Sequence, residues 1–238
     1  MPEKMQKEQD MTIDEARELV ANQSLWPLVR DFLWDFVPQV HSSWLEGLED
    51  LSASNVSSLM SSPRVKRFVM SSLGVEPCFH KFPKDDFSRL LLLDGATLES
   101  LSKWIGALVC ADKLRRITDG ATVRALKAEL HGVYPEVFGY TAYFAGLKTE
   151  DLELKIEEGN LAGIGIAGCR ILLSLLDSLP ASLVVRLKLK LPKAYSDPQS
   201  SIFNPQSSIL NPQSSIFNHQ SLTRLLKLKF PEAYSLCC

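Results

Sequence analysis

The stretch Thr97-Leu-Glu-Ser-Leu-Ser-Lys-Trp-Ile-Gly-Ala-Leu-Val109 sets the fold class of this 238-residue chain. Its apolar residues recur at intervals of three and four, the period of one helix face; they are Leu98, Leu101, Ile105 and Leu108. Asp94-Gly95 breaks the apolar run before it, and Thr97 is expected to cap the helix. Glu99 and Lys103 predict an ion pair on the exposed side. The stretch therefore predicts a helix with one buried face.

The same period recurs in both directions along the chain and predicts a mainly α fold. The expected helices are a short one opened by Thr12 and Glu15, Leu25–Val37 before Pro38, a helix capped by Ser62 that starts at Pro63 and ends at Gly74, Val123–Leu130 before Gly132, and Leu161–Leu179 before Pro180. Asp85 and Asp86 are expected as charges at a helix N-terminus. One run differs, because Leu187, Leu189 and Leu191 alternate with lysines and predict a short strand.

Composition limits the kinds of partner. The chain is 45% hydrophobic, which suffices for one core of ordinary size. Its 26 Lys and Arg residues balance 28 Asp and Glu residues, so nucleic acid and membrane surfaces are not expected partners. Met1–Asp10 lacks the apolar core of a signal peptide, which favours a cytosolic protein. The cysteines are odd in number and mostly far apart, which predicts reduced thiols; they are Cys78, Cys110, Cys169, Cys237 and Cys238.

The most membrane-like segment is Leu161–Leu179. Arg170 lies near its centre and Asp177 near its end. A central arginine costs about 2.5–3.5 kcal/mol on insertion scales, and the uncharged flanks are too short to span a bilayer. The segment therefore predicts a buried core helix without membrane insertion, and we expect Gly165→Leu to disrupt the fold by overpacking.

The C-terminal region contains a repeat with a period of seven residues. Asp197-Pro-Gln-Ser-Ser-Ile-Phe recurs from Asn204 and Asn211 and decays at Asn218. The repeat separates Leu187-Lys-Leu-Lys-Leu-Pro-Lys-Ala-Tyr-Ser196 from a near copy that starts at Leu226. Proline in nearly every unit and low apolar content favour disorder. We therefore expect one compact helical domain over residues 1–196 and a disordered tail over 197–238, with Leu226–Pro231 loose or weakly docked.

Candidate chemical motifs are few, and each has a structural interpretation. Gly163-Ile-Gly-Ile-Ala-Gly168 matches the dinucleotide-binding pattern, but no buried strand precedes it, so helix packing on small residues is favoured. Cys78 and His80 lack further ligands for zinc or a base for a nucleophile. Cys237-Cys238 resembles a lipidation signal and is interpreted as incidental. His41, His131 and His219 stand in unrelated settings. No catalytic, metal or cofactor-binding residue is predicted, no small-molecule ligand is expected, and the chain is not expected to be an enzyme.

A helix-turn-helix motif is the strongest alternative from another class. Lys113–Leu130 would form it, with Asp119-Gly120 as the turn and Arg124 and Lys127 on the second helix. The chain is slightly acidic and has no basic arm. The basic residues of this segment are therefore interpreted as a solvated helical face; they are Lys113, Arg115, Arg116, Arg124 and Lys127.

Three stretches resemble the YscK/SctK family, the cytosolic accessory proteins of bacterial type III secretion systems, which are related to OrgA and MxiK. The stretches are Leu25-Trp-Pro-Leu-Val-Arg-Asp-Phe-Leu33, the block from Leu90-Leu-Leu-Leu93 through the helices up to Leu130, and Ile156-Glu-Glu-Gly-Asn-Leu161 leading to Arg186-Leu-Lys-Leu-Lys-Leu-Pro192. The last motif is similar to the closing Arg-Leu-x-Leu-x-Leu-Pro of the family. The resemblance covers residues 25–192 and is expected to end at the first copy.

The resemblance implies a helical adaptor of the sorting platform beneath the injectisome. Such a protein would join the cytoplasmic domain of the inner-membrane ring protein, SctD, to the pod protein, SctQ. It would be cytoplasmic and peripherally associated with the secretion apparatus. A helix-turn-helix regulator and a secretion chaperone remain alternatives, and periodicity alone does not identify the residues that contact each partner.

Overall fold

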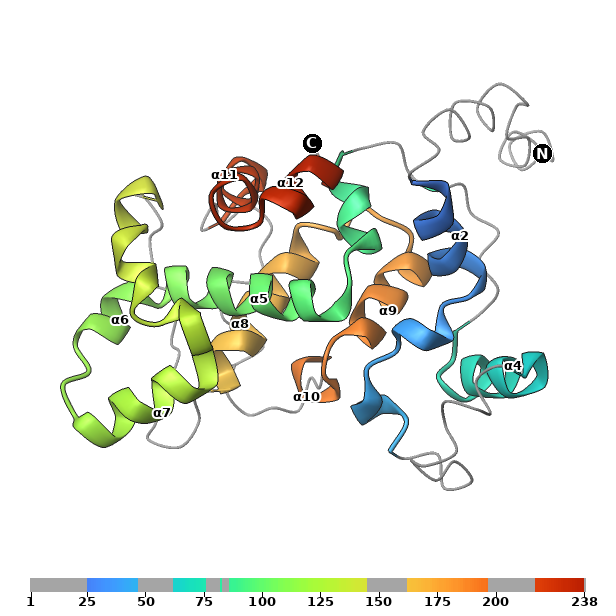
Figure 1. Cartoon of the computed structure of the whole chain (residues 1–238), viewed down its shortest axis with the longest axis horizontal. Helices are drawn as coiled ribbons and strands as arrows, with labels where there is room; N and C mark the ends of the chain where they lie inside the picture. The colour runs from blue at the N-terminus through green and yellow to red at the C-terminus, as the bar shows by residue number, and fades with distance from the viewer. Residues whose placement is uncertain are drawn as a thin grey trace, which may run out of the picture.

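The computed structural model describes residues 25–46, 62–75, 82, 86–144, 162–196 and 217–237. Within these ranges all regular elements are helices, which confirms the mainly α class (Figure 1). The α-helices are α2 (Trp26–Trp34), α4 (Pro63–Ser72), α5 (Gly95–Val109), α6 (Ala111–Arg115), α7 (Gly120–Leu130), α8 (Ala162–Ser174), α9 (Ala181–Lys190), α10 (Lys193–Ser196), α11 (His219–Lys229) and α12 (Pro231–Cys237). Short 3₁₀-helices join them: η1 (Val37–Gln39), η2 (Ser42–Trp44), η3 (Asp86–Leu92), η4 (His131–Val133), η5 (Glu136–Gly139) and η6 (Thr141–Phe144).

Helices α5 and α8 pack against each other at the centre of the molecule (Figure 1). A Cβ atom on Gly168 would overlap the carbonyl oxygen of Ser102, and one on Gly106 would overlap the carbonyl oxygen of Ile164. The two backbones therefore touch where glycine stands on both helices. This confirms the prediction that the small residues of the Gly163–Gly168 stretch serve close helix packing.

The α8 helix is the predicted core helix. Nearly all of its side chains are buried, and Arg170 is half-buried. None of the described helices is long and apolar enough to cross a membrane. Gly165 faces α10, where an added Cβ would overlap the hydroxyl of Tyr195. The side chain added by Gly165→Leu would therefore collide with Tyr195, which is a specific cause for the expected overpacking.

The α5 helix begins two residues before the predicted cap. Asp94 is the N-cap, and its carboxylate accepts hydrogen bonds from the backbone N–H (2.8 Å) and the hydroxyl (2.7 Å) of Thr97. The prediction that Thr97 caps the helix is therefore wrong, because aspartate reaches the free N–H groups of the first turn from outside the helix. Asp119 caps α7 in the same way through Thr122 (2.7 Å).

The strand predicted at Leu187, Leu189 and Leu191 is wrong, because these residues belong to α9 and its C-cap. Alternation of leucine and lysine indicates a strand only if the lysines face solvent. Here Lys190 is as buried as Leu189, at 1% and 3% exposure. A helix buried on most of its circumference produced the misleading pattern.

The second copy of the Leu-Lys-Leu-Lys motif is folded and packed. Helices α11 and α12 bury five side chains in the same core as the rest of the described chain: Leu222, Leu225, Leu226, Ala233 and Cys237. Helix α12 lies against η3 (Figure 1). The expectation that Leu226–Pro231 is loose is therefore wrong. The repeat at 197–216 lies outside the described residues, as do the short helix expected at Thr12 and the Cys78–His80 pair.

Candidate functional site

Helix α9 carries two buried cations that hold the ends of two other helices. The guanidinium of Arg186 donates to the carbonyl oxygen of Phe32 (3.1 Å) in the last turn of α2. The side-chain nitrogen of Lys190 donates to the carbonyl oxygens of Leu91 (2.7 Å) and Leu93 (2.9 Å) at the end of η3. The last carbonyls of a helix lack partners within it and carry its negative end. Each cation therefore closes one helix end and attaches it to α9.

Aromatic rings complete the surroundings of these cations. Arg186 lies over the ring of Phe36 (5.4 Å to its centre), and Lys190 lies over the ring of Phe32 (4.9 Å). Burial lowers the pKa of Lys190 to about 7, because removal from water disfavours the charged form. A neutral amine still has two hydrogens, one for each carbonyl. The lysine can therefore hold η3 in either protonation state.

The residues at the end of α9 fasten the N-terminal part of the described chain. The carbonyl oxygen of Leu189 accepts from the backbone N–H of His41 (2.8 Å), and that of Leu191 accepts from the indole N–H of Trp44 (2.9 Å). Together with the Arg186 bond, these contacts place α2, η1 and η2 against α9. The motif from Arg186 to Pro192 is thus the structural anchor of one end of the molecule.

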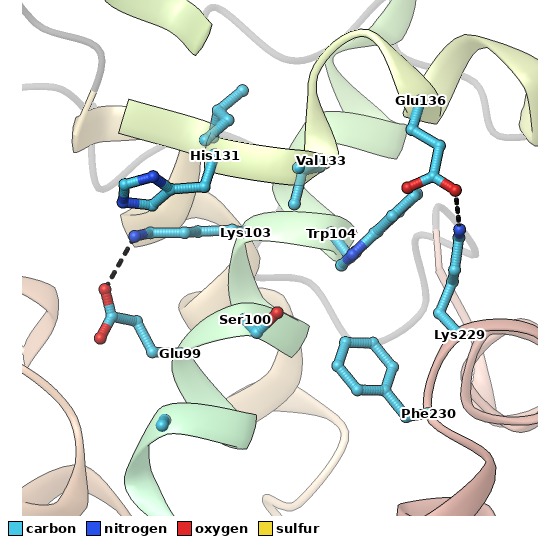
Figure 2. A pocket seen from close by; sticks show the side chains of 12 residues that line it. Glu99, Ser100, Lys103, Trp104, His131, Val133, Glu136, Lys229 and Phe230 are labelled. Carbon is cyan, nitrogen blue, oxygen red and sulfur yellow. Dashed lines mark hydrogen bonds and ion pairs between the residues drawn. The ribbon is translucent and has the colours of Figure 1, made fainter. Parts of the chain in front are cut away.

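A recess of about 520 Å³ opens between α5, the turn from α7 into η5, and the end of α11 (Figure 2). Trp104 and Val133 form apolar walls, and Phe230 closes one side. Lys229 and Phe230 come from the second copy of the duplicated motif. The recess therefore exists only because the second copy is packed here.

Each side of the recess carries an ion pair. Glu99 and Lys103 pair at 2.8 Å along α5, as the sequence predicted. Lys229 pairs with the carboxylate of Glu136 and lies over the ring of Trp104, 4.7 Å from its centre (Figure 2). Both pairs are internally neutral, so the recess has no excess charge that would select an ion. Its chemistry favours an apolar group with polar edges.

His131 stands at the rim of the recess in an unusual backbone conformation. Its φ is 42° and its ψ is −130°, and it directly precedes Gly132. Non-glycine residues rarely adopt positive φ, and such a conformation costs about 1–3 kcal/mol. The tight turn ends α7 and directs η4 back onto α5. His131 thereby helps to shape the recess (Figure 2).

Large apolar side chains face solvent at the two ends of the long axis of the molecule. Trp34 at the end of α2 is 59% exposed, and Phe68 on α4 is 50% exposed. An ion pair between Asp35 and Lys66 joins the end of α2 to α4. Figure 1 shows α6 and α7 at the opposite end of the long axis, and Tyr143 of η6, which follows them in the chain, is 54% exposed. These ends are candidate protein-binding surfaces.

The family model described as YOP proteins translocation protein K (YscK) matches residues 31–238. The chain belongs to the YscK family. It is therefore a protein of type III secretion, and its family consists of secretion accessory proteins. No curated protein and no protein of solved structure matches the chain.

The extent of the YscK match differs from the expected one. The match continues past Pro192 to the end of the chain, so the expectation that the resemblance ends at the first copy is wrong. The packing of α11 and α12 gives the physical reason, because both belong to the same core as the helices before them. Leu25–Arg30 precede the match, although they open the first similar stretch.

The histidines and cysteines singled out in the sequence occupy separate places in this YscK protein. His41 caps η2, His131 borders the recess, and the His219 ring packs on that of Phe87, 4.2 Å between centres. Among the described residues, no three His, Cys, Asp or Glu side chains gather as metal ligands would. The described cysteines are buried, namely Cys110, Cys169 and Cys237. Burial raises the pKa of the Cys110 and Cys169 thiols to about 12, which makes both unreactive.

The basic residues of the predicted helix-turn-helix segment do not share one surface role. Arg115 donates to the hydroxyl of Thr141 (2.6 Å) and lies over the ring of Phe138 (5.6 Å), so it joins α6 to the η5–η6 region. Arg124 and Lys127 are exposed on α7. The first helix of the expected motif, α6, has only five residues.

Sequence reasoning missed three structural features of this YscK protein. Arg186 and Lys190 carried the resemblance, but nothing in the pattern showed that both are buried. The recess joins α5 to residues more than 100 positions later in the chain. Trp34 lies in the predicted helix Leu25–Val37 and is exposed, and its position on the helix wheel, away from Phe32 and Leu33, was a usable signal.

Proposed function

We propose that this YscK-family protein is a non-enzymatic adaptor that links the cytoplasmic domain of an SctD-like ring protein to an SctQ-like pod protein. The observation that carries the proposal is the exposure of aromatic side chains on elements far apart in an elongated helical body: Trp34 on α2 and Phe68 on α4, and Tyr143 on η6. Figure 1 shows α2 and α4 at one end of the long axis and α6 and α7 at the other. Aromatic residues are enriched in protein interfaces. Two separated surfaces suit a protein that holds two partners apart.

The core supports this role mechanically. The backbones of α5 and α8 touch at Gly106 and Gly168, which leaves no space for the helices to slide. Arg186 and Lys190 bind the ends of α2 and η3 to α9. A body braced in this way transmits position between its ends. The proposed adaptor is cytoplasmic and reaches the membrane only through its ring partner.

Co-purification from a type III secretion host tests the proposal. The tagged full chain is expected to recover the ring and pod proteins, and purified pairs are expected to bind each partner separately and both together. Recovery of exported substrates without apparatus proteins would instead support the secretion chaperone. Specific DNA binding that is lost in Arg124→Ala, with neither apparatus protein bound, would support the helix-turn-helix regulator.

A further inference from the structure

Helix α4 presents a basic and aromatic face to solvent. Arg64, Arg67, Phe68 and Ser71 are exposed, while Val69 on the opposite side is fully buried. Helical spacing places the four exposed side chains within one half of the helix surface. We call this surface the α4 face.

The α4 face is held firmly against the body. Val69 inserts into the interior, and Lys66 pairs with Asp35, the residue after Trp34. At the C-terminal end of α4, the backbone N–H of Val75 donates to the carbonyl oxygen of Met70 (2.8 Å). The Phe68 side chain on this surface is therefore displayed by an anchored helix.

The charges on this end of the molecule are unevenly compensated. Arg30 pairs with Asp31 (2.8 Å), and Lys66 pairs with Asp35. Among the described residues, no carboxylate lies within ion-pair distance of Arg64 or Arg67. Two guanidinium groups on the α4 face thus remain available to carboxylates from another molecule.

This combination selects one class of partner. Arginine is among the residues most enriched at the positions that dominate binding in protein interfaces. Anionic membrane surfaces are bound by clusters of about four to eight basic residues, more than the α4 face offers. Nucleic acid binding likewise depends on many phosphate contacts, and the chain carries a net charge of −2. An exposed aromatic ring beside two arginines on one helix face fits an acidic protein segment with an apolar side chain.

We infer that the α4 face is a docking site for an acidic segment of a partner protein that carries at least one large apolar side chain. Its carboxylates pair with Arg64 and Arg67, and its apolar side chain covers Phe68. The inference rests on the proposed adaptor function and specifies the chemistry of one of the two partners. The other partner binds elsewhere.

The test measures the affinity of the full chain for the purified cytosolic domain of the ring protein and for the purified pod protein, at low and moderate salt. The charge reversal Arg64→Glu/Arg67→Glu is expected to weaken binding to one partner by about tenfold or more and to flatten its salt dependence. Phe68→Ala is expected to weaken binding to the same partner by a similar factor. Binding to the other partner is expected to change less than about twofold.

Matched controls come from the rest of the chain. Arg124→Glu/Lys127→Glu makes the same charge change at the same spacing on exposed positions of α7, and Leu228→Ala removes an apolar side chain that is 39% exposed on α11. Neither control is expected to change the affinity for the partner to which the α4 variants bind more weakly. Unchanged circular dichroism and melting temperature show that the variants are folded.

The outcomes separate the two proposals. If the wild-type chain binds both partners and the α4 variants bind them equally well, the docking inference is wrong while the adaptor function stands. If the wild-type chain binds neither partner, the adaptor function fails and the inference fails with it. Binding of the wild-type chain to anionic lipid vesicles or to DNA that Arg64→Glu/Arg67→Glu abolishes, with partner binding intact, would overturn the inference in favour of that surface.

Discussion

The side-chain nitrogen of Lys190 lies 2.7 Å from the carbonyl oxygen of Leu91 and completes the C-terminal end of η3 from inside the core. The equivalent lysine of the second copy, Lys229, instead pairs with Glu136 at the edge of the recess. Arg186 is replaced in the second copy by Leu225, which is fully buried. Two nearly identical segments thus fill two different positions in one fold.

Replacing Lys190 with methionine is expected to lower the free energy of unfolding by about 2 kcal/mol or more. The substitution keeps most of the side-chain volume but leaves two buried carbonyl groups without their donor, and each such loss costs about 1–3 kcal/mol. Urea denaturation followed by circular dichroism measures the change. Lys188→Met, two residues earlier and half-buried, is the control and is expected to change stability by less than about 0.5 kcal/mol. Equal effects of the two variants would contradict the structural role of Lys190.

Stability is expected to rise between about pH 7 and pH 9, above which ionisation of Cys110 and Cys169 in the unfolded chain opposes the rise, because burial raises the pKa of both thiols in the folded protein. The pKa of Lys190 is lowered to about 7 in the folded protein by burial, while an exposed lysine keeps a pKa near 10.5. Between these values the unfolded chain binds the proton and the folded chain does not, so raising the pH favours folding. Urea midpoints measured across this range test the prediction. Lys190→Met is expected to remove most of the rise in stability. A wild-type midpoint that falls or stays flat over this range would contradict the prediction.

The contact between α5 and α8 predicts a large effect of a single methyl group. Gly168→Ala places a Cβ on the carbonyl oxygen of Ser102, so the helices must separate, and we expect a loss of about 3 kcal/mol or more. Gly120→Ala at the start of α7 meets no atom within 4 Å and is expected to be neutral or stabilising by about 0.4–1 kcal/mol. Thermal melting of both variants measures the difference. Similar melting temperatures would show that the backbones are not in contact.

Much of this architecture could be predicted from periodicity. The apolar spacing identified α5, α7 and the start of α8 within a few residues, because each has one dominant buried face or is largely buried. It placed the end of α8 too late, at Leu179, whereas the helix ends at Ser174. The prediction failed at α9, because the alternation of apolar and polar residues cannot show that Lys190 binds carbonyl groups inside the core. Thr97 was taken as a cap because Asp94-Gly95 is also a common turn signal. The recess and the α4 face depend on contacts between distant segments, which no local pattern reports.

Truncation after Ser196 is expected to destabilise the protein strongly, which reverses the expectation drawn from the sequence. It removes α11 and α12, whose leucines are fully buried at Leu222, Leu225 and Leu226. Burial of one leucine contributes about 1.5–3 kcal/mol, so the loss is comparable with the 5–15 kcal/mol stability of a typical domain. It also exposes η3 and the Trp104 side of α5. We expect a lower urea midpoint and aggregation of the truncated chain.

A point variant separates loss of packing from loss of chain length. Leu225→Ala leaves the chain intact and removes one fully buried side chain, so it is expected to cost about 2–5 kcal/mol. Leu228→Ala, on the same helix but 39% exposed, is expected to cost less than about 1 kcal/mol. If both variants and the truncated chain have the melting temperature of the wild type, α11 does not occupy the position described and the first copy alone completes the core. A large loss for Leu225→Ala alone establishes that the second copy is part of the fold.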